Sequence, residues 1–429
     1  MSGPLAGIRV VDLTSAVLGP IATQILGDMG ADVIKIEPPE GDPIRPLGPA
    51  RHFGMGAYFL NINRNKRSVA LDLKRPAARE ALLKLTETAD VFVHNMRLGA
   101  AERLSVDYAA IAARNPRVIY AAATGFRRNG AHRDRPSFDD VIQGESGLAA
   151  LNGGVGGEPR YVPMAVCDKI CGYVLASTIG MALYHRERTG AGQELHVPML
   201  ETMVAFNLVD HLWHGVLAEP EKGLGYPRML TPHRRSFPTK DGHICILATT
   251  NTQSRHLLEA IGRPELADDE RFSTLARRTD NIGELYEIVI EHMRRRTTAQ
   301  WHDRLDQFDV PNGGVVTDLE DLLADPYLAE TRFFEPVEHP TEGKMLTMAI
   351  PVEFSGSPGE SFRLPPPRLG EHTRTVLGNS VIPILKSKRS TPSRSSSQMP
   401  AAGQNRILHP QSWFAASAAN LQQTLSYCL

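Results

Sequence analysis

The first 125 residues alternate between two hydrophobic patterns. Short apolar runs rich in β-branched residues recur four times and predict strands. They occupy residues 8–13, 31–37, 90–94 and 116–125. Three segments with apolar residues at helical spacing separate these runs. They cover residues 18–30, 75–90 and 107–115. Strands that alternate with helices pair in parallel, so this part predicts an α/β domain with a doubly wound, Rossmann-like parallel sheet.

The alternation continues to about residue 220. Residues 168–188 predict a long helix, rich in Gly and Ala, that packs closely against another element. Residues 193–200 predict one more strand. We therefore expect residues 1–220 to form the N-terminal part of a large domain.

Three further segments follow. Gly, Pro and Glu gather at 215–230, which is a candidate linker, and residues 225–330 then carry one strand and several helical segments. We expect 225–330 to form a smaller α/β domain, and 331–378 to return as strands that complete the large domain. Residues 379–429 are rich in Ser, Pro and Arg, a low-complexity composition that predicts disorder.

Composition narrows the possible functions. The chain has 47 Lys and Arg against 48 Asp and Glu, a net charge of -1, which argues against a dedicated nucleic-acid binder. Four cysteines are too few for a disulfide framework in 429 residues. No signal peptide and no run of 18 apolar residues is evident, so we expect a cytoplasmic protein with no membrane or nucleic-acid partner. The glycines at 153–157 fail the GxGxxG pattern and predict a plain loop.

Several ordered blocks are more specific than composition. They are the N-terminal PLAGIRVVDLT with GADVIKIEPPEGDPIR, then NRNKRSVALDLK (63–74), ADVFVHNMRLGAAERL (89–104), RPSFDDVIQGESGL (135–148) and LGEHTRTVLG (369–378). Together they resemble the class III CoA-transferases, the CaiB/BaiF or formyl-CoA transferase family, over about residues 4–378. The resemblance implies an enzyme that moves CoA from an acyl-CoA to a free carboxylate. It also implies an obligate, interlocked homodimer, and no metal, redox group or other permanently bound cofactor.

The resemblance also implies a catalytic residue, Asp168, in VPMAVCDKICG. An aspartate at a helix N-terminus is a good cap and interacts favourably with the helix dipole. Its ordinary pKa of about 3.9 leaves it ionised at neutral pH and able to act as a nucleophile. Without the resemblance, a purely structural cap is the alternative reading.

Seven residues are expected to contact CoA by their position in the family. They are Ala16, Val17, Leu71, Lys74, Asn95, Met96 and Arg103. The two basic members would neutralise phosphates, and the methionine would contact adenine or pantetheine. Arg45, Arg64 and Lys66 are further basic candidates, with a solvated surface charge as the alternative for each.

Other residues around the site have weaker assignments. A loop around Gly223 and Gly225 is the candidate oxyanion-binding loop. Cys167 and Cys171 are interpreted as packing residues, and His372 as structural. Four arginines could bind phosphate or an acceptor carboxylate, or could form a solvated loop. They are Arg127, Arg128, Arg133 and Arg135.

Two competing functions remain. An α-methylacyl-CoA racemase of the same superfamily needs a histidine where this chain has Phe138, and phenylalanine cannot move a proton. A non-catalytic CoA-binding or nucleic-acid-associated protein has only the basic tail in its favour. The segment HRRSFPTKDG (233–242) favours succinyl-CoA as donor and a small dicarboxylate as acceptor.

Overall fold

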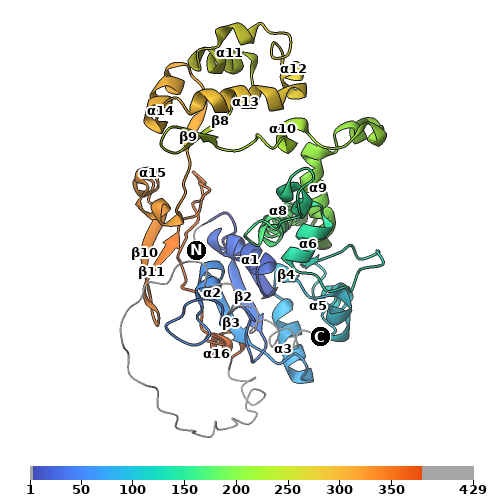
Figure 1. Cartoon of the computed structure of the whole chain (residues 1–429). Helices are drawn as coiled ribbons and strands as arrows, with labels where there is room; N and C mark the ends of the chain where they lie inside the picture. The colour runs from blue at the N-terminus through green and yellow to red at the C-terminus, as the bar shows by residue number, and fades with distance from the viewer. Residues whose placement is uncertain (1–2, 379–429) are drawn as a thin grey trace, which may run out of the picture.

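A six-stranded parallel sheet organises the larger part of the molecule (Figure 1). The structure, a computed structural model, describes residues 3–378. The strands are β1 (Arg9–Leu13), β2 (Asp32–Glu37), β3 (Lys66–Ala70), β4 (Val91–His94), β5 (Ile119–Thr124) and β6 (Gln193–Pro198). Their order is β3-β2-β1-β4-β5-β6, with every neighbouring pair parallel. β2 and β3 therefore lie on one side of β1 and β4 to β6 on the other, so the strand order reverses between β1 and β4.

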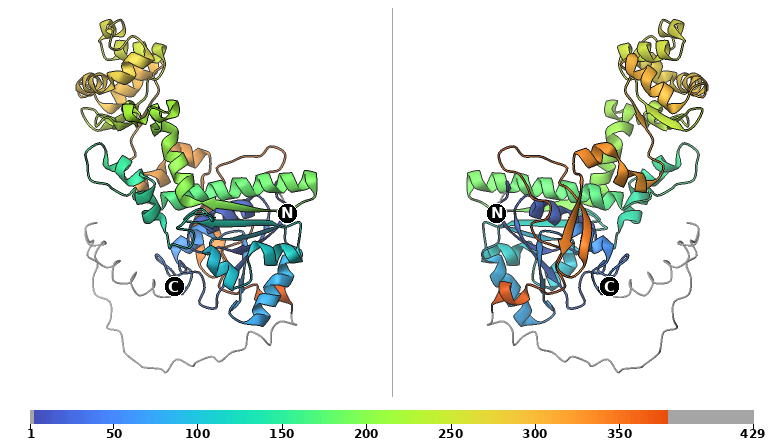
Figure 2. Two further views of the ribbon diagram at one scale, coloured as in Figure 1. Left: turned by 90° about the vertical axis from the view of Figure 1, so that its right-hand side faces the viewer. Right: turned by 90° about the vertical axis from the view of Figure 1, so that its left-hand side faces the viewer.

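Helices cover both faces of this sheet, which confirms the doubly wound prediction. One face packs against α1 (Leu18–Asp28) and the long α8 (Val166–Thr189). Figure 2 shows α8 as a long helix that runs along one face of the sheet. The other face packs against α3 (Pro76–Thr86), α4 (Leu98–Arg103) and α5 (Tyr108–Arg114). Each face of the sheet has its own hydrophobic core. Val10 of β1 packs in one core and Val11 and Leu13 in the other, because successive side chains of a strand point to opposite faces.

Several short helices lie outside the two main helical layers. Three of them belong to the larger part, namely α2 (Ala57–Ile62), α6 (Asp139–Glu145) and α7 (Leu148–Gly153). The connection itself consists of α9 (Met199–His211), η1 (Trp213–Leu217), η2 (Pro220–Lys222) and α10 (Pro227–Leu230). The predicted linker at 215–230 is therefore folded into short helical turns. Of the predicted loop at 153–157, Gly153 is the last residue of α7, and residues 154–157 form a turn that opens no helix, as predicted.

The upper part has its own sheet and its own core. Its sheet contains β7 (Phe237–Pro238), β8 (His243–Ile246) and β9 (Asn312–Gly314), paired antiparallel. Its helices are α11 (Asn251–Ala260), η3 (Pro264–Ala267), α12 (Leu275–Asp280), α13 (Ile282–Met293) and α14 (Thr298–Gln307). Capping boxes at Thr250 and Thr297 begin α11 and α14. Ile244, Val289 and Trp301 are fully or almost fully buried in its core.

The chain then returns along the larger part. This segment contains η4 (Leu319–Ala324), α15 (Pro326–Glu330), β10 (Phe334–His339), β11 (Gly343–Met348) and α16 (Thr373–Leu377). β10 and β11 pair only with each other, so they do not extend the large sheet. Side chains make the connection instead: Arg64 donates to Thr347 Oγ1 at 2.9 Å, and Leu364 N donates to Asn65 Oδ1 at 2.8 Å.

One helix of the described residues, α8, is long and apolar enough to cross a membrane by length and composition. Its buried face packs against α1 and the sheet. A core helix of this kind passes the same test as a membrane span, so this observation is weak evidence for a membrane segment.

Candidate active site

The candidate site begins at the point where β1 and β4 diverge. Leu13 and His94 pair at the carboxyl ends of these adjacent strands. Ser15 follows β1 and Asn95 follows β4, and the two residues are joined twice. Ser15 N donates to Asn95 Oδ1 at 2.9 Å, and Asn95 Nδ2 donates to the Ser15 carbonyl at 2.8 Å. Ligands of open α/β sheets bind in the crevice at such a switch point.

Four of the seven expected CoA contacts flank this crevice. Ala16 and Val17 lie in the turn that leads into α1, and Asn95 and Met96 lie directly after β4. Ala16, Asn95 and Met96 are half-buried, whereas the side chain of Val17 is buried. The parallel sheet brings these segments together although about 80 residues separate them along the chain.

The other three expected contacts have different surroundings. The side chain of Leu71 lies in the core and is 1% exposed, and its backbone N–H donates to the Glu37 carbonyl. Lys74 and Arg103 are exposed, at the start of the segment before α3 and at the end of α4. Only the two basic residues are therefore free to present their side chains to a ligand.

Asp168 is the third residue of α8 and is half-buried. The N-cap of α8 is Ala165, so the carboxylate lies in the first turn and does not cap the helix, contrary to the expectation from sequence. The Asp168 backbone N–H donates to Asp139 Oδ1 at 2.9 Å. This bond fixes the start of α8 against α6.

The electrostatic surroundings of Asp168 differ from the sequence expectation. Burial, followed by the charges of the neighbouring Asp139 and Asp140 carboxylates, raises the pKa of Asp168 to about 7. The expectation of a carboxyl fully ionised at neutral pH was therefore wrong. Asp168 therefore holds its proton to a much higher pH than an ordinary aspartate does. The ionised form is correspondingly more basic than an ordinary aspartate.

Two neighbours of Asp168 were missed by the sequence analysis. Asp139 is 8% exposed and also accepts a hydrogen bond from Gln143 Nε2 at 2.6 Å. Tyr58, in α2, has its pKa raised by burial and by the charges of Asp168 and Asp139, so all three groups interact. The acidic pair at 139–140 is visible in the sequence, but no local pattern places it beside a residue 29 positions away.

The further basic candidates are engaged elsewhere. Arg45 makes a two-pronged ion pair with Glu37, at 2.7 Å for each nitrogen, and Arg64 pairs with Asp28 at 2.7 Å. Lys66 is fully buried and donates to the Pro20 carbonyl. These three side chains are therefore already engaged within the fold.

The loop arginines, the two cysteines and His372 have contacts that suit structural roles. Each of the four arginines forms an ion pair with a carboxylate, as in a solvated loop. The pairs are Arg127–Glu201, Arg128–Glu194, Arg133–Glu102 and Arg135–Glu145. Cys167 and Cys171 are fully buried and burial raises the pKa of both thiols, which suits packing residues. His372 ties the return segment to β3 through its backbone N–H and Ser68 O at 2.9 Å.

The doubly wound sheet and its switch-point crevice define a class of α/β proteins that bind nucleotide-like ligands. A family model described as CoA-transferase family III matches residues 5–373. This chain belongs to the CoA-transferase family III.

Relatives with assigned activities support the same conclusion. Succinyl-CoA:glutarate CoA-transferase of Homo sapiens is 31% identical, with 87% of this chain and 85% of that protein covered. Acetyl-CoA:oxalate CoA-transferase of Acetobacter aceti is 32% identical, with 90% and 97% covered. The chain is therefore an enzyme that transfers CoA, with an acyl-CoA as substrate.

Solved structures show the same fold. Rv3272 from Mycobacterium tuberculosis superposes with a TM-score of 0.75 at 30% identity, covering 87% of this chain and 99% of that one. A CAIB/BAIF family protein from Brucella suis gives 0.71 at 30% identity, with 88% and 99% covered.

Proposed function

We propose that this enzyme transfers CoA through a covalent intermediate on Asp168. The observation that carries the proposal is a half-buried carboxyl whose pKa lies near 7, at the start of a helix and beside Asp139. Strongly perturbed carboxyls concentrate at catalytic sites because burial that penalises charge in the ground state makes the ionised form reactive.

The chemistry follows from a carboxylate and a thioester. Asp168 Oδ attacks the acyl carbonyl, and the C–S bond breaks to release CoA thiolate and leave a mixed anhydride. The thiolate then attacks the aspartyl carbonyl, which forms aspartyl-CoA thioester and frees the donor acid. An acceptor carboxylate attacks that thioester, and CoA thiolate returns to the new acyl carbonyl, so that Asp168 is regenerated. No step requires a metal or a redox cofactor, and water must be excluded from both reactive intermediates.

The CoA moiety is proposed to bind at the β1–β4 crevice. Ala16, Val17, Asn95 and Met96 would contact it there, and the exposed Lys74 and Arg103 would neutralise its phosphates. Leu71 would contribute through its backbone. The loop around Gly223 and Gly225 does not fit the oxyanion role expected from sequence. The Gly223 N–H donates to the Pro220 carbonyl at 3.0 Å and the Gly225 N–H to the His211 carbonyl at 2.9 Å, so neither group is proposed as an oxyanion donor.

We propose succinyl-CoA as donor and a small dicarboxylate as acceptor. The relatives named for succinyl-CoA and glutarate support this choice, although the oxalate enzyme of Acetobacter aceti is equally similar. A cavity of about 320 Å³ in the upper part adds a physical argument. Three arginines line it, and no carboxylate is among its described lining residues: Arg228, Arg234 and Arg235. Guanidinium groups are suited to the distal carboxylate of such acids.

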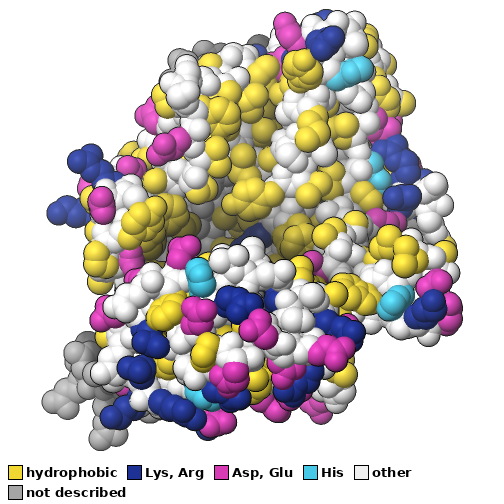
Figure 3. Space-filling view, turned by 90° about the horizontal axis from the view of Figure 1, so that it is seen from above, with side chains coloured by type: hydrophobic (Ala, Val, Ile, Leu, Met, Phe, Trp, Pro, Cys, Tyr) yellow, Lys and Arg dark blue, Asp and Glu magenta, His cyan; other side chains and the backbone are white. Residues whose placement is uncertain are grey.

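A second copy of the chain is the proposed partner, in an interlocked homodimer. Large apolar side chains of α8 and α9 are exposed, among them Tyr173, Met181, Tyr184, Phe206 and Val209. Figure 3 shows apolar side chains gathered along the walls of a hollow in the upper face. Apolar surface of this extent marks an interface. Light scattering after size exclusion measures the mass of the assembly and so tests the dimer.

We also propose that the enzyme acts in the cytoplasm, without nucleic-acid or membrane partners.

Two alternative functions have less support than this proposal. The racemase needs a proton-transferring residue at position 138, where Phe138 is exposed and precedes α6. A non-catalytic CoA-binding protein would keep its function in Asp168→Asn, whereas a transferase would lose turnover and keep CoA binding.

The test is covalent trapping. The protein is incubated with succinyl-CoA and, separately, acetyl-CoA, then treated with hydroxylamine and analysed by peptide mass spectrometry. Conversion of Asp168 to its hydroxamate, absent from Asp168→Asn, is the expected result. Transfer activity without any hydroxamate at Asp168 would refute the covalent route. The donor that gives the label identifies the acyl class.

A further inference from the structure

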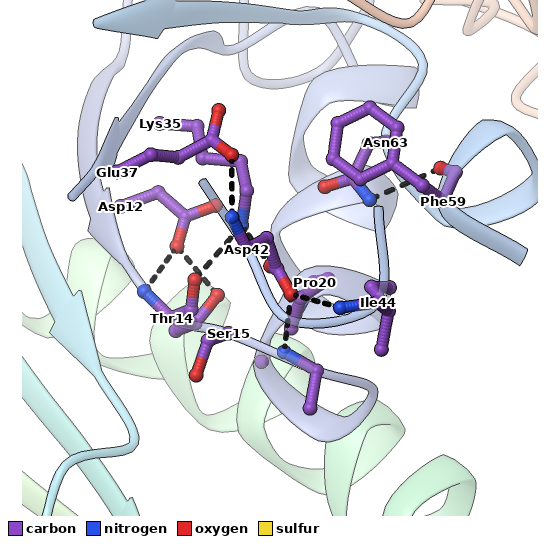
Figure 4. A network of polar contacts seen from close by, with 12 residues as sticks. Asp12, Thr14, Ser15, Pro20, Lys35, Glu37, Asp42, Ile44, Phe59 and Asn63 are labelled. Atoms are coloured by element: carbon purple, nitrogen blue, oxygen red, sulfur yellow. Dashed lines mark hydrogen bonds and ion pairs between the residues drawn. The ribbon is translucent and has the colours of Figure 1, made fainter. Parts of the chain in front are cut away.

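A buried cluster of charged side chains surrounds the turn that precedes α1 (Figure 4). Three carry carboxyl groups and three carry basic groups, and each is at most 3% exposed: Asp12, Lys35, Glu37, Asp42, Arg45 and Lys66. Taking charges out of water is costly, and well-packed apolar residues often give equal or greater stability. The cluster therefore calls for a reason other than stability.

The backbone of this turn is held by side chains at every residue. The N–H groups of residues 14–16 each donate to a different side chain. Their acceptors are Asp12 Oδ1 at 2.8 Å, Asn95 Oδ1 at 2.9 Å and Asp42 Oδ1 at 3.1 Å, in that order. Asp12 lies two residues before Thr14, whereas Asn95 and Asp42 come from distant parts of the chain, so local and tertiary contacts together impose the shape of the turn.

The ion pair of Lys35 and Asp42 spans the turn. Lys35 Nζ lies 2.8 Å from Asp42 Oδ2 and also donates to the Thr14 carbonyl at 2.8 Å. Asp42 holds the Ala16 N–H on the other side. Burial alone lowers the pKa of Lys35, but Asp42 and the neighbouring carboxylates raise it above its usual value, so the lysine stays charged.

The conformation held in this way is one that the chain disfavours by itself. Ala16 has a φ of +62°, in the left-handed region that residues with a side chain rarely adopt. The turn is also tightly packed against α1. A Cβ added to Gly19 would lie 2.2 Å from Thr14 Cβ, so only glycine fits there. Without its side-chain partners the turn would relax to other backbone conformations.

We propose that the Lys35–Asp42 ion pair is a positioning pair that holds the Thr14–Ala16 turn in the conformation that binds CoA. The inference rests on the proposed function, in which Ala16 and Val17 contact CoA. When only a fraction of molecules has the competent turn, the apparent dissociation constant rises by the inverse of that fraction. The pair should therefore act on CoA affinity and not on the acceptor acid or on the chemical steps.

The double variant Lys35→Met/Asp42→Asn tests this directly. It removes both charges, so neither is left buried without a partner, and the stability cost stays small. We expect the Kd for free CoA, measured by titration calorimetry, and the KM for succinyl-CoA to rise about tenfold, as for a competent fraction near one tenth. The kcat and the KM for the acceptor acid should stay within about twofold of wild type.

A second buried ion pair of the same domain provides the control. Arg64→Met/Asp28→Asn removes a pair of similar burial that does not contact the turn, and it should leave CoA affinity unchanged. Thermal unfolding checks that each variant is folded. If the double variant at Lys35 and Asp42 does not fold, the single Asp42→Asn is used instead. It leaves Lys35 beside the carboxylates of Asp12 and Glu37 and keeps an oxygen acceptor for the Ala16 N–H, and it should weaken CoA binding about threefold.

The possible results separate the two proposals. Unchanged CoA affinity in the folded variant would overturn the positioning role, and so would equal increases in both KM values. A wild-type protein that binds CoA and transfers it keeps the proposed function, whatever the variant does. A wild-type protein that does neither would overturn both.

Discussion

The substitution Asp168→Asn should make the protein more stable while abolishing its turnover. The fold resists ionisation of this carboxyl, because burial and the charges of Asp139 and Asp140 raise its pKa to about 7 from the ordinary 3.8. Asparagine has nearly the same shape and carries no charge. The backbone N–H of residue 168 still donates to Asp139 in the variant.

The size of the effect follows from the two pKa values. Their difference of about 3 corresponds to about 4 kcal/mol, at about 1.36 kcal/mol per pKa unit. A carboxyl with a raised pKa holds its proton more tightly in the folded state than in the unfolded state. Its contribution to stability therefore falls as the pH rises from about 4 to about 7, and the full cost is present above pH 7. We expect Asp168→Asn to gain up to about 4 kcal/mol at pH 8 and about 2 kcal/mol or less at pH 5.

The assay is urea denaturation of wild type and variant at both pH values. Asp303→Asn, at an exposed position of α14, is the matched control and should change stability little at either pH. A gain for Asp168→Asn that is the same at pH 5 and pH 8 would refute the reasoning, because it would not come from ionisation. Destabilisation that grows with pH would show that the native carboxylate is stabilised by its surroundings.

Three further outcomes are expected. Asp140→Asn removes one negative charge near Asp168, so the acid-side midpoint of the pH–rate profile should fall by about a few tenths of a pH unit. An unchanged midpoint would show that the ionisation of Asp168 does not control the rate. Arg45→Met leaves Glu37 buried without its partner and should lower stability by about 3–5 kcal/mol in denaturation experiments, whereas a loss below about 1 kcal/mol would contradict the buried-pair interpretation. Truncation after Gly378 should leave melting temperature and transfer rate nearly unchanged, and an inactive or unfolded product would contradict this.

The doubly wound sheet could be predicted because its strands are buried on both faces. Such strands read as continuous apolar runs, as in residues 119–124, where every residue is buried. β3 was not recognised as a strand, because NRNKRSVALDLK carries buried polar residues such as Lys66 and Ser68 that pair with distant groups. The polar pattern of that segment reflects tertiary contacts, which local periodicity does not contain.

The candidate site was predicted only in part. Asp168 and the crevice residues came from the resemblance to a family, and they remain predictions. The pKa of Asp168 could not be inferred, because it depends on burial and on Asp139 from another helix. Likewise, Arg45 and Arg64 are of a residue type that often binds phosphate. Only the structure shows that each is already paired with a carboxylate.

The return segment has a consequence for folding during synthesis. β3 is the edge strand of the large sheet, and its open side is covered by Ser68 N–H to His372 Nδ1 and by Ala70 N–H to Thr373 Oγ1. Those partners lie 304 and 303 residues further along the chain. At about 5–20 residues per second, a ribosome needs roughly 15–60 s to deliver them. During that interval the nascent sheet exposes an unpaired edge, which is a template for association with other chains. Chaperone dependence of expression is therefore expected to follow the timing of this closure.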